Sequence, residues 1–400
     1  MTQYQVNIKE VREFRFKNPV YFGIGAIKKI NDIAKDLKSK KINKVLVMTG
    51  RNAYKATGAW KHVEAALIEN GIKFVSFNEV TPNPTVDHVD IAAKLGKKFG
   101  AKAVIAIGGG SAIDAGKSTA ILLENKRKNA RQLYGFEFTP TKAAPVVAIN
   151  LTHGTGTEGN RFAVATIEES GWKPALAYDC IYPMVSIVDP ALMTTLSENQ
   201  TKYVSIDAVN HVIEAATTKM ASPYSITLAK EVIRLVAEHL PTVIKNPKDL
   251  EARYYLAYAA TIAGVSFDHG LLHYTHALEH PLSGMHPKLP HGLGLAMLVP
   301  SVVKEIYPAK SEVLKEILSP ILTGKEKTGN QVAKALENWI FSVGVKSKLK
   351  DEGFTKDDIK QLVSLAFETP SLGLLLSMAP TKATKKTVEK IFTESMTKMR

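Results

Sequence analysis

Carboxylate and imidazole side chains gather in two stretches of the second half of the chain. In SIDAVNHVIEA (205–215), Asp207 and His211 stand four residues apart, so on a helix both can reach one metal ion. The stretch FDHGLLHYTHALEHPLSGMHPKLPHG (267–292) adds more than half of the chain's histidines: His269, His273, His276, His280, His286 and His291.

Two interpretations of these histidines compete. On a single helix, residues 269, 273, 276 and 280 would form one stripe, and a stripe of that kind can consist of inert, hydrogen-bonded side chains. Together with the Asp207–His211 pair, the clustering favours a metal site. Nitrogen and oxygen ligands without thiolate suit Fe²⁺, Zn²⁺, Ni²⁺ or Mn²⁺, so the ligand types alone leave the ion open.

Glycines in the first half suggest a phosphate site. GGGSAID (108–114) follows the apolar run AVIAI (103–107) directly. A buried strand, then glycines, then a helix start would offer free backbone N–H groups and a positive dipole end to a phosphate. We expect Ser111 to cap this helix and Asp114 to lie in its first turn. A tight turn without a ligand is the alternative, since the pattern is not the usual G-x-G-x-x-G.

A second glycine cluster, LTHGTGTEG (151–159), follows the run PVVAIN (145–150). Its hydroxyls and backbone donors would reach the same edge of the sheet as the first cluster, because ligands of such folds bind at the carboxyl ends of the strands. The two clusters together predict one deep cleft.

The elements that must position these residues change along the chain. Short β-branched runs predict strands at 44–49, 73–77, 103–107, 145–150 and 184–189. Between the first four, the segments 53–71 and 86–100 show helical spacing and end on glycine. This alternation predicts parallel pairing in a doubly wound α/β sheet.

After Asp189 and Pro190 the pattern is helical only. The segments 228–246, 250–267 and 311–322 carry apolar residues at three- and four-residue spacing with almost no alternation. We therefore expect an α/β domain over residues 1–190 and an all-helical domain over residues 191–400.

Composition limits the function classes. At 400 residues the chain exceeds what one core usually serves, and 45% hydrophobic residues is ordinary for a globular protein. The net charge of +14 comes from lysines spread through segments such as 38–44, 124–131 and 382–390, without interleaved aromatic residues. This favours a solvated surface, and no nucleic-acid partner is expected.

The compartment expected from the sequence is the cytoplasm. The N-terminus MTQYQVNIKEVREF (1–14) carries charges where a signal peptide would need an apolar core, and no run approaches the length of a membrane span. The single cysteine, Cys180, agrees with a reducing compartment. We expect a soluble protein without a membrane partner.

Read in order, the motifs resemble those of the iron-containing (group III, metal-dependent) alcohol dehydrogenases. The resemblance runs from VYFGIGAIKKI (20–30) through TPNPT (81–85), GGGSAID and GTGTE (154–158) to D-x3-H and H-x3-H-P-L-S-G…H-G (276–292). It covers nearly the whole chain. The histidine region is its most specific part, whereas glycerol dehydrogenases and dehydroquinate synthases share the glycine motifs.

The resemblance implies a metal-dependent NAD(P) alcohol dehydrogenase or aldehyde reductase that acts on small alcohols or aldehydes, often as a homodimer. The first half would be a Rossmann-like dinucleotide-binding domain and the second a metal-binding domain. The ion, Fe²⁺ first and Zn²⁺ second, would be held by Asp207, His211, His276 and His291. His280 would stand beside the nicotinamide and the substrate as a proton-relay or positioning group.

The resemblance also assigns the cofactor's contacts. The pyrophosphate and adjoining sugar would lie on Gly108, Gly109, Gly110, Ser111 and Asp114. Thr152 and Thr155 would face the nicotinamide end, Lys173 would approach a ribose, and Asn83 would lie near the adenine. A divalent ion held by one carboxylate and three neutral imidazoles favours the alkoxide of a bound alcohol, much as such an ion lowers the pKa of a bound water to about 7.

Three departures from the family pattern qualify these assignments. His153 and Thr157 replace other residues in the second glycine cluster, and the segment between His280 and His291 is one residue longer than in many members and contains His286. The substrate is therefore left open.

The third departure concerns the cofactor. Gly50 stands where members specific for NAD often carry an aspartate that repels the 2′-phosphate of NADP. Arg51, Asn52 and Lys55 would instead bind that phosphate. The sequence therefore favours NADP over NAD, the alternative being that these side chains merely face solvent.

A rival function of a different class is a lyase of the dehydroquinate-synthase kind, which also combines nicotinamide and metal between an α/β half and a helical half. That enzyme would need a basic, phosphate-binding substrate pocket, and the metal-ligand spacing follows the dehydrogenases. A glycerol-dehydrogenase-like enzyme is the other alternative.

Overall fold

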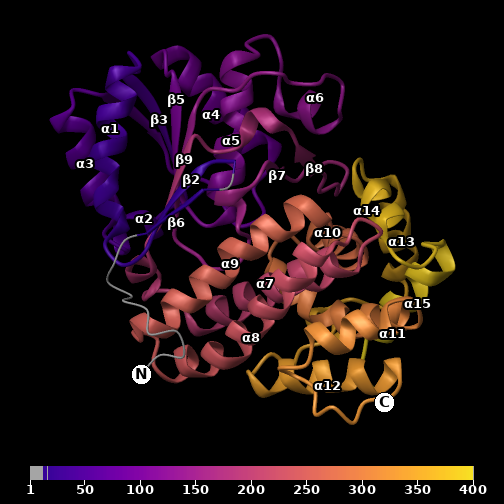
Figure 1. Ribbon diagram of the computed structural model, residues 1–400. Coiled ribbons are helices and arrows are strands. Elements are labelled where there is room, and N and C mark those ends of the chain that lie inside the picture. The colour runs from indigo at the N-terminus through magenta and orange to yellow at the C-terminus, as the bar shows by residue number, and fades with distance from the viewer. Residues whose placement is uncertain (1–11, 16, 400) are drawn as a thin grey trace.

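The computed structural model describes residues 12–15 and 17–399 (Figure 1). Most of the N-terminal segment on which the absence of a signal peptide was expected lies outside these residues. The first half of the chain forms a seven-stranded sheet of order β1-β2-β9-β6-β5-β3-β4. Its strands are β1 (Arg12–Arg15), β2 (Pro19–Phe22), β3 (Lys44–Thr49), β4 (Lys73–Phe77), β5 (Ala103–Gly108), β6 (Val146–Asn150) and β9 (Val185–Val188).

All neighbouring strands of this sheet run parallel except β1 and β2. The strands expected from the five β-branched runs are present as β3, β4, β5, β6 and β9, because such runs fit a sheet that is buried on both faces. The sequence did not predict β1, β2 or the small antiparallel hairpin of β7 (Phe162–Val164) and β8 (Ala175–Ala177).

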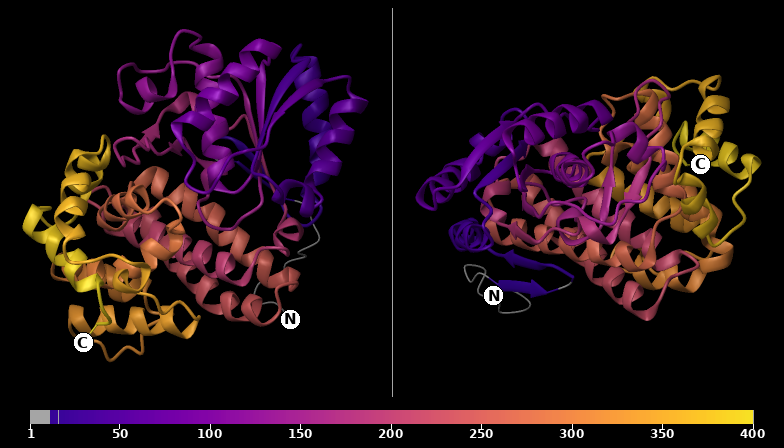
Figure 2. Two further views of the ribbon diagram at one scale, coloured as in Figure 1. Left: turned by 180° about the vertical axis from the view of Figure 1, so that it is seen from behind. Right: turned by 90° about the horizontal axis from the view of Figure 1, so that it is seen from above.

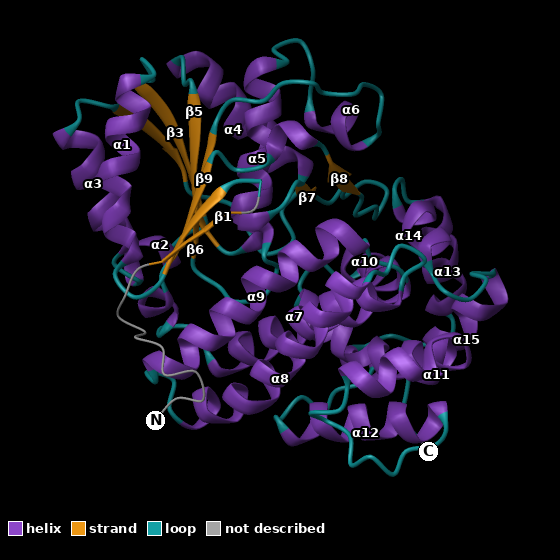
Figure 3. Ribbon diagram, viewed as in Figure 1, coloured by secondary structure: helices purple, strands orange, loops and turns teal. Residues whose placement is uncertain are grey.

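Helices cover both faces of the sheet (Figure 3). One face packs against α1 (Ile30–Ser39), α2 (Ala53–Ala56) and α3 (Ala59–Glu69), and the other against α4 (Val86–Phe99), α5 (Gly110–Glu124) and α6 (Ala130–Tyr134). The single helix expected over 53–71 is two helices, because Gly58 between α2 and α3 adopts a left-handed conformation with φ 84°.

From Glu198 onward the described chain is helical, as the spacing of apolar residues predicted. The larger helices are α7 (Glu198–Thr217), α8 (Pro223–Lys245), α9 (Leu250–Gly270), α10 (Tyr274–Met285), α11 (His291–Ile317), α12 (Gly329–Ser342), α13 (Asp358–Glu368), α14 (Leu372–Met378) and α15 (Lys385–Ser395). Among the described helices, none combines the length and apolar character that crossing a bilayer requires.

Side-chain caps fix where the long helices of this half begin. Ser197 accepts a hydrogen bond from Gln200 N at the start of α7, and Asp249 accepts one from Ala252 N at the start of α9. Each cap satisfies an amide that has no partner inside the helix. The caps therefore set the register of α7, the helix that carries Asp207.

The two halves lie one above the other (Figure 2). They approach closely at two pairs of glycines. A Cβ on Gly264 of α9 would stand 2.2 Å from the carbonyl oxygen of Gly156, and one on Gly284 of α10 would stand 2.1 Å from that of Gly171. Backbone meets backbone at both places, so no side chain larger than hydrogen fits.

Candidate metal centre and active site

The two glycine clusters meet at the carboxyl edge of the sheet, as expected. β5 and β6 are paired neighbours, and Leu151 N donates to Gly108 O at 2.9 Å. A Cβ on Gly109 would stand 2.8 Å from Thr152, and one on Gly110 would stand 2.5 Å from Thr155. The glycines are therefore needed for loop-to-loop packing as well as for any ligand.

The start of α5 differs from the prediction. Gly109 is the N-cap residue and no side chain caps the helix, so Ser111 lies inside the first turn and Asp114 beyond it. Asp114 is half-buried and accepts from Thr157 Oγ1 at 2.7 Å and from Val164 N at 3.0 Å. Both of its oxygens thus anchor the second glycine loop and the β7–β8 hairpin.

Lys117, which the sequence analysis missed, fixes the same loop. Its fully buried ammonium donates to Thr157 O at 2.6 Å, Thr157 Oγ1 at 2.7 Å and Phe162 O at 2.8 Å. Burial lowers the pKa of Lys117 to about 8 although Asp114 lies nearby. A lysine in the otherwise apolar stretch AGKSTAILL (115–123) was the available signal. Thr157, one of the differences from the family pattern, is therefore part of this buried hydrogen-bond network.

A long cleft, here called the outer cleft, runs along this edge with a volume of about 670 Å³. One end is lined by Gly50, Ala53 and Val80, and the middle by both glycine loops with Thr152. The far end reaches Asp207 and His291 in the helical half. Its length and the helix start beneath it suit an extended ligand with phosphate groups.

A smaller apolar cavity of about 150 Å³, here called the inner cavity, adjoins the outer cleft. It is lined by Phe162, Val164, Phe267, Leu272 and Leu375 together with the histidines 211, 276, 280 and 291. His291, Thr155, Ser111, Gly110 and Asn83 line both spaces. The two spaces therefore meet beside the imidazoles.

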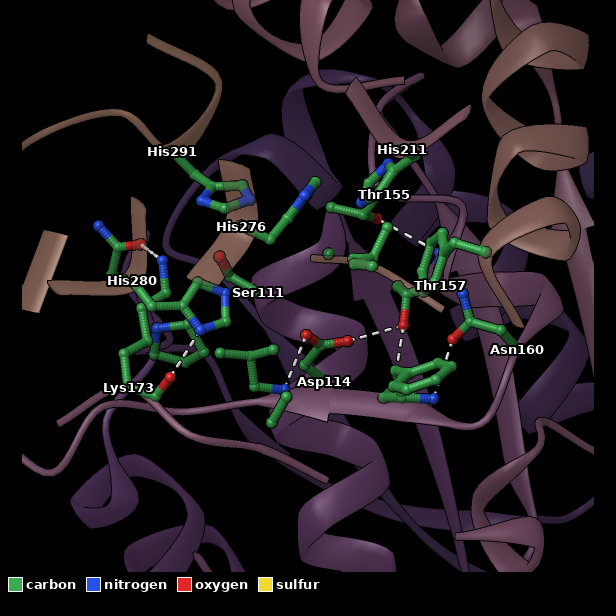
Figure 4. A pocket seen from close by; sticks show the side chains of 18 of the residues that line it. Ser111, Asp114, Thr155, Thr157, Asn160, Lys173, His211, His276, His280 and His291 are labelled. Carbon is green, nitrogen blue, oxygen red and sulfur yellow. Dashed lines mark hydrogen bonds between the residues drawn. The ribbon is translucent and has the colours of Figure 1, made fainter. Parts of the chain in front are cut away.

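Three of the four expected metal ligands form a compact group. The ligand atoms of Asp207, His276 and His291 all lie within 4.8 Å of one another. Asp207 Oδ1 stands 3.6 Å from His276 Nε2 and 3.9 Å from His291 Nε2. His211 lies beside them, with Nδ1 3.5 Å from the same oxygen and its ring stacked on His276 at 4.6 Å. In Figure 4, His211, His276 and His291 face the same space.

The residues present fit a divalent cation. Asp207 Oδ1, His211 Nδ1 and His276 Nε2 are buried polar atoms without a hydrogen-bond partner among the described residues. Buried polar atoms are normally paired, and a cation would satisfy several of them at once. Burial would raise the pKa of Asp207, but the three imidazoles lower it to about 2, so this ligand stays ionised.

Two buried glutamates orient the histidines, and the sequence analysis missed both. His276 Nδ1 donates to Glu214 Oε2, and His291 Nδ1 donates to Glu279 Oε2. These bonds leave each Nε2 free to bind a cation. Glu214 stands seven residues after Asp207 on the same face of α7, and that spacing was the available signal.

Glu214 also binds backbone amides at the start of α10. Its Oε1 accepts from the backbone amides of His273 and Thr275, both at 2.9 Å. Burial would raise the pKa of Glu214, but His276 and these amides lower it to about 2. One carboxylate thus caps the helix that carries His276 and holds the ring of that histidine.

The expected four-histidine stripe does not exist. α9 ends at Gly270 and α10 begins at Tyr274, and Leu271 between them has φ 60°, so one continuous helix is interrupted. His269 is exposed, and its Nδ1 lies 2.8 Å from Val265 O. His273 caps α10 with its own side chain. His269 and His273 do not line the inner cavity. Of the four histidines, only His276 and His280 do.

The other two unusual histidines also lie away from the cavities. His286 stacks on Phe354 with ring centroids 4.2 Å apart. His153 is fully buried near Arg253, and burial lowers its pKa to about 3. Neither residue lines the outer cleft or the inner cavity.

His280 lines the inner cavity as a neutral imidazole. Its Nδ1 donates to the carbonyl oxygen of Lys173 at 2.7 Å, which leaves Nε2 as an acceptor. Burial, and then the nearby Lys173 ammonium, hold the pKa of His280 well below its ordinary value. His280 is not a member of the compact group formed by Asp207, His276 and His291.

Lys173 and Asn83 join the two halves beside this histidine. Lys173 Nζ donates to Asn83 Oδ1 at 2.9 Å and to Ser283 Oγ at 2.8 Å, so its ammonium is engaged by the protein. Asn83 Nδ2 donates to the carbonyl oxygens of Pro287 and Leu289, at 3.0 and 3.2 Å. Asn83 therefore stands where the outer cleft meets the inner cavity.

The position expected to select the cofactor lies at the opposite end of the outer cleft. Gly50 follows β3 and lines the cleft, and a Cβ on it would stand 3.3 Å from Val80 O. Arg51 and Asn52 are exposed beside it, and Lys55 is exposed with its ammonium over the Tyr54 ring. Their side chains are not part of the cleft wall.

Comparisons with known proteins agree with this architecture. The model of a family described as iron-containing alcohol dehydrogenase matches residues 18–190, and the model of that family's C-terminal part matches residues 201–396. The chain is 57% identical to the long-chain primary alcohol dehydrogenase of Thermoanaerobacter ethanolicus, over 99% of this chain and 100% of that one.

More distant relatives also match over most of the chain. The NAD-dependent methanol dehydrogenase of Bacillus methanolicus is 31% identical over 86% of this chain and 91% of its own. The crystal structure of the NADH-dependent butanol dehydrogenase A of Thermotoga maritima superposes with a TM-score of 0.87 at 29% identity, covering 98% of this chain and 99% of that one.

Proposed function

The chain belongs to the iron-containing alcohol dehydrogenase family and is an NAD(P)-dependent alcohol oxidoreductase, and we propose that its substrates are primary aliphatic alcohols and the corresponding aldehydes. The observation that carries the proposal is the meeting of the outer cleft and the apolar inner cavity beside the unpaired atoms of Asp207 and His276. The similarity to the long-chain primary alcohol dehydrogenase of Thermoanaerobacter ethanolicus supports substrates with longer chains than the small alcohols first expected.

We assign the divalent cation, Fe²⁺ first and Zn²⁺ second, to Asp207, His276, His291 and the adjoining His211. When bound, the cation acts as a Lewis acid that lowers the pKa of an alcohol hydroxyl and polarises an aldehyde. Glu214 and Glu279 hold two of the imidazoles with Nε2 directed inward. The apolar walls Phe162 and Phe267 exclude water from the reacting carbon.

His280 is proposed as the group that moves or positions the hydroxyl proton. Its Nδ1 is held by Lys173 O, so Nε2 can accept a proton from the substrate hydroxyl in the inner cavity. Its low pKa means that a proton taken up there is released readily, which suits a relay.

The nicotinamide cofactor is proposed to lie along the outer cleft. Its pyrophosphate would rest on the glycine loop at residues 108–110 and on Ser111, at the start of α5. Thr152 and Thr155 would line the path toward the nicotinamide, which would reach the inner cavity near Asn83 and Lys173. The adenine end belongs beside Gly50, Ala53 and Val80, so we move Asn83 from the adenine side to the nicotinamide side.

We retain NADP as the proposed preferred cofactor, because Gly50 offers no carboxylate to repel a 2′-phosphate and Arg51 and Asn52 are exposed beside it. Asp114, whose oxygens are engaged by Thr157 and Val164, is proposed to act on the cofactor only through the loop that it anchors. We also propose a homodimer, and a division into units at residues 1–190 and 191–400.

Turnover tests the proposal directly. Metal-depleted protein reloaded with Fe²⁺ or Zn²⁺ should consume NADPH or NADH in the presence of butyraldehyde, followed as loss of the absorbance of the reduced nicotinamide. A lyase would show no net consumption. No loss with either cofactor and any of the tested metals would contradict the proposed reaction.

A further inference from the structure

Three large apolar side chains stand exposed around one side of the inner cavity. They are Met220 in the loop between α7 and α8, Tyr224 at the start of α8, and Leu374 on α14, with exposed fractions of 55%, 47% and 55%. We call these three residues the apolar collar. Exposed apolar side chains that gather in one place commonly mark a binding surface.

Hydrogen bonds hold the segments of two collar residues, Met220 and Leu374, against each other. Lys219, next to Met220, donates its backbone N to Met378 O at 3.0 Å and its Nζ to Ser377 O at 2.7 Å. The loop that carries Met220 is thereby attached to the end of α14, four residues from Leu374. Met220 and Leu374 thus lie on adjoining segments.

Contacts of Tyr224 and Thr218 attach the same loop to the end of α9. The Tyr224 ring packs edge-on against that of His269, at 5.3 Å between centroids. Thr218 Oγ1 donates to Gly270 O at 2.6 Å. Leu272, two residues further along the chain, lines the inner cavity.

The collar is continuous with the wall of the inner cavity. Leu375, the chain neighbour of Leu374 on α14, also lines the cavity. Leu272 and Leu375 of the cavity wall therefore lie on segments that carry the collar or are hydrogen-bonded to the loop that carries it. A polar substrate would gain nothing from these apolar side chains.

The size of the cavity shows why an external surface is needed. An apolar cavity of about 150 Å³ holds a molecule the size of benzene, whereas sites that enclose larger ligands measure about 300–1,000 Å³. An alcohol of roughly six carbons would fill the inner cavity. The remaining methylenes of a longer chain must lie outside it.

We propose that the apolar collar binds the distal part of a long alkyl chain whose hydroxyl end occupies the inner cavity. This inference rests on the proposed function and adds where the chain leaves the cavity and what it then contacts. Full burial of one methylene strengthens binding about fourfold, and a chain on an open surface buries about half of each, so about twofold per methylene is expected beyond the cavity.

A chain-length series with the metal-loaded enzyme tests the collar. For the wild type, kcat/KM should keep rising from hexanol to dodecanol. In the double variant Met220→Gln/Leu374→Gln this rise should flatten, so that dodecanol loses at least tenfold while ethanol changes by less than twofold. The matched control is Ile68→Gln on α3, which is 67% exposed and far along the chain from the collar.

Binding measured without turnover separates this inference from the proposed function. The dissociation constant of dodecanol, measured by calorimetry on the metal-loaded enzyme without nicotinamide, should rise at least tenfold in the double variant. That result would stand even if no alcohol were turned over, which would overturn the proposed function alone.

Two outcomes would overturn the collar as a substrate surface. One is a chain-length profile and a dodecanol affinity that are unchanged in the double variant. The other is an unchanged profile together with loss of binding to phosphatidylcholine vesicles, which would assign the same residues to a lipid surface.

Discussion

The guanidinium Nε of Arg161 lies 3.2 Å from Oδ1 of Asp268, and this ion pair joins the α/β half to the end of α9. Tyr182 donates its hydroxyl to the other oxygen of Asp268. Phe162 follows Arg161 in the chain, and Phe267 precedes Asp268. The ring centroids of these two phenylalanines lie 5.3 Å apart, and Phe267 stacks on His211. The ion pair thus supports an aromatic wall on which a metal-site histidine rests.

Breaking this pair should disturb substrate binding more than chemistry. Arg161→Gln should raise the KM for butanol up to about fivefold with little change in kcat, since a partly exposed ion pair is worth about 0.2–1 kcal/mol. Steady-state kinetics measures the split. Arg127→Gln, at an exposed arginine outside both cavities, is the control, and an equal effect there would contradict the assigned role.

Glu214→Gln should weaken metal binding by about 10- to 100-fold, because the residue that orients His276 loses its charge while the ligands remain. Competition with a chelator, followed by metal analysis, gives the affinity. Glu198→Gln is a matched change in the first turn of the same helix, where the carboxylate is exposed and pairs with Lys202. Equal metal affinities in the two variants would remove Glu214 from the site.

The cavity histidines should fall into two groups. His211→Ala, His276→Ala and His291→Ala should each lose the metal and turnover, because each removes a ligand from a small set. His280→Ala should retain the metal but lose activity. The metal content of each variant, with folding checked by circular dichroism, distinguishes the two groups. A His280→Ala variant without metal beside a His276→Ala variant that retains it would reverse the assignment along α10.

The cofactor preference should respond to one residue at the end of β3. If kcat/KM is higher with NADP⁺ than with NAD⁺, Gly50→Asp should lower that ratio about tenfold or more, because its carboxylate would repel the 2′-phosphate. The substitution must fit against Val80 O, so Gly50→Ala is the control for packing alone. A wild type that prefers NAD⁺ would contradict the proposed preference.

His153 should make the fold sensitive to mild acid. Its pKa is about 3 in the folded protein and about 6.5 in the unfolded chain, so only the unfolded state takes up the proton between these values. Stability should therefore fall as the pH drops below 6.5, by about 2 kcal/mol between pH 7.5 and 5.

Urea unfolding of His153→Leu across this range should lack that loss. His62→Leu, at an exposed histidine, should retain it. Identical pH dependence in His153→Leu and the wild type would show that His153 does not carry the effect.

The sequence predicted those strands and helices whose apolar pattern reflects burial in the fold. The runs that became β3, β5 and β6 are β-branched because both faces of the sheet are covered, and apolar spacing marked the helical half for the same reason. The family motifs brought Asp207 and His276 to one site. Each of these patterns lies within a short segment of the chain, so it can be read without knowledge of tertiary contacts.

Features that depend on distant contacts were missed. The roles of Glu214 and Glu279 exist only once α7, α10 and α11 pack together. The spacing of Glu214 from Asp207 indicates a shared helix face, but it does not identify the histidine that Glu214 binds. The turn at Leu271 was hidden because its flanking histidines continue a helical spacing across it. Its left-handed backbone is stabilised by tertiary packing, which a spacing rule does not register.

The two glycine pairs between the halves, Gly156 with Gly264 and Gly171 with Gly284, restrict how the enzyme can move. A rigid body held at two points retains one degree of freedom, rotation about the line that joins them. Any opening that preserves both contacts is therefore a swing about this axis and not a separation of the halves. Exchange of the nicotinamide would then follow a single hinged path, which side chains at Gly156, Gly264 or Gly284 would obstruct.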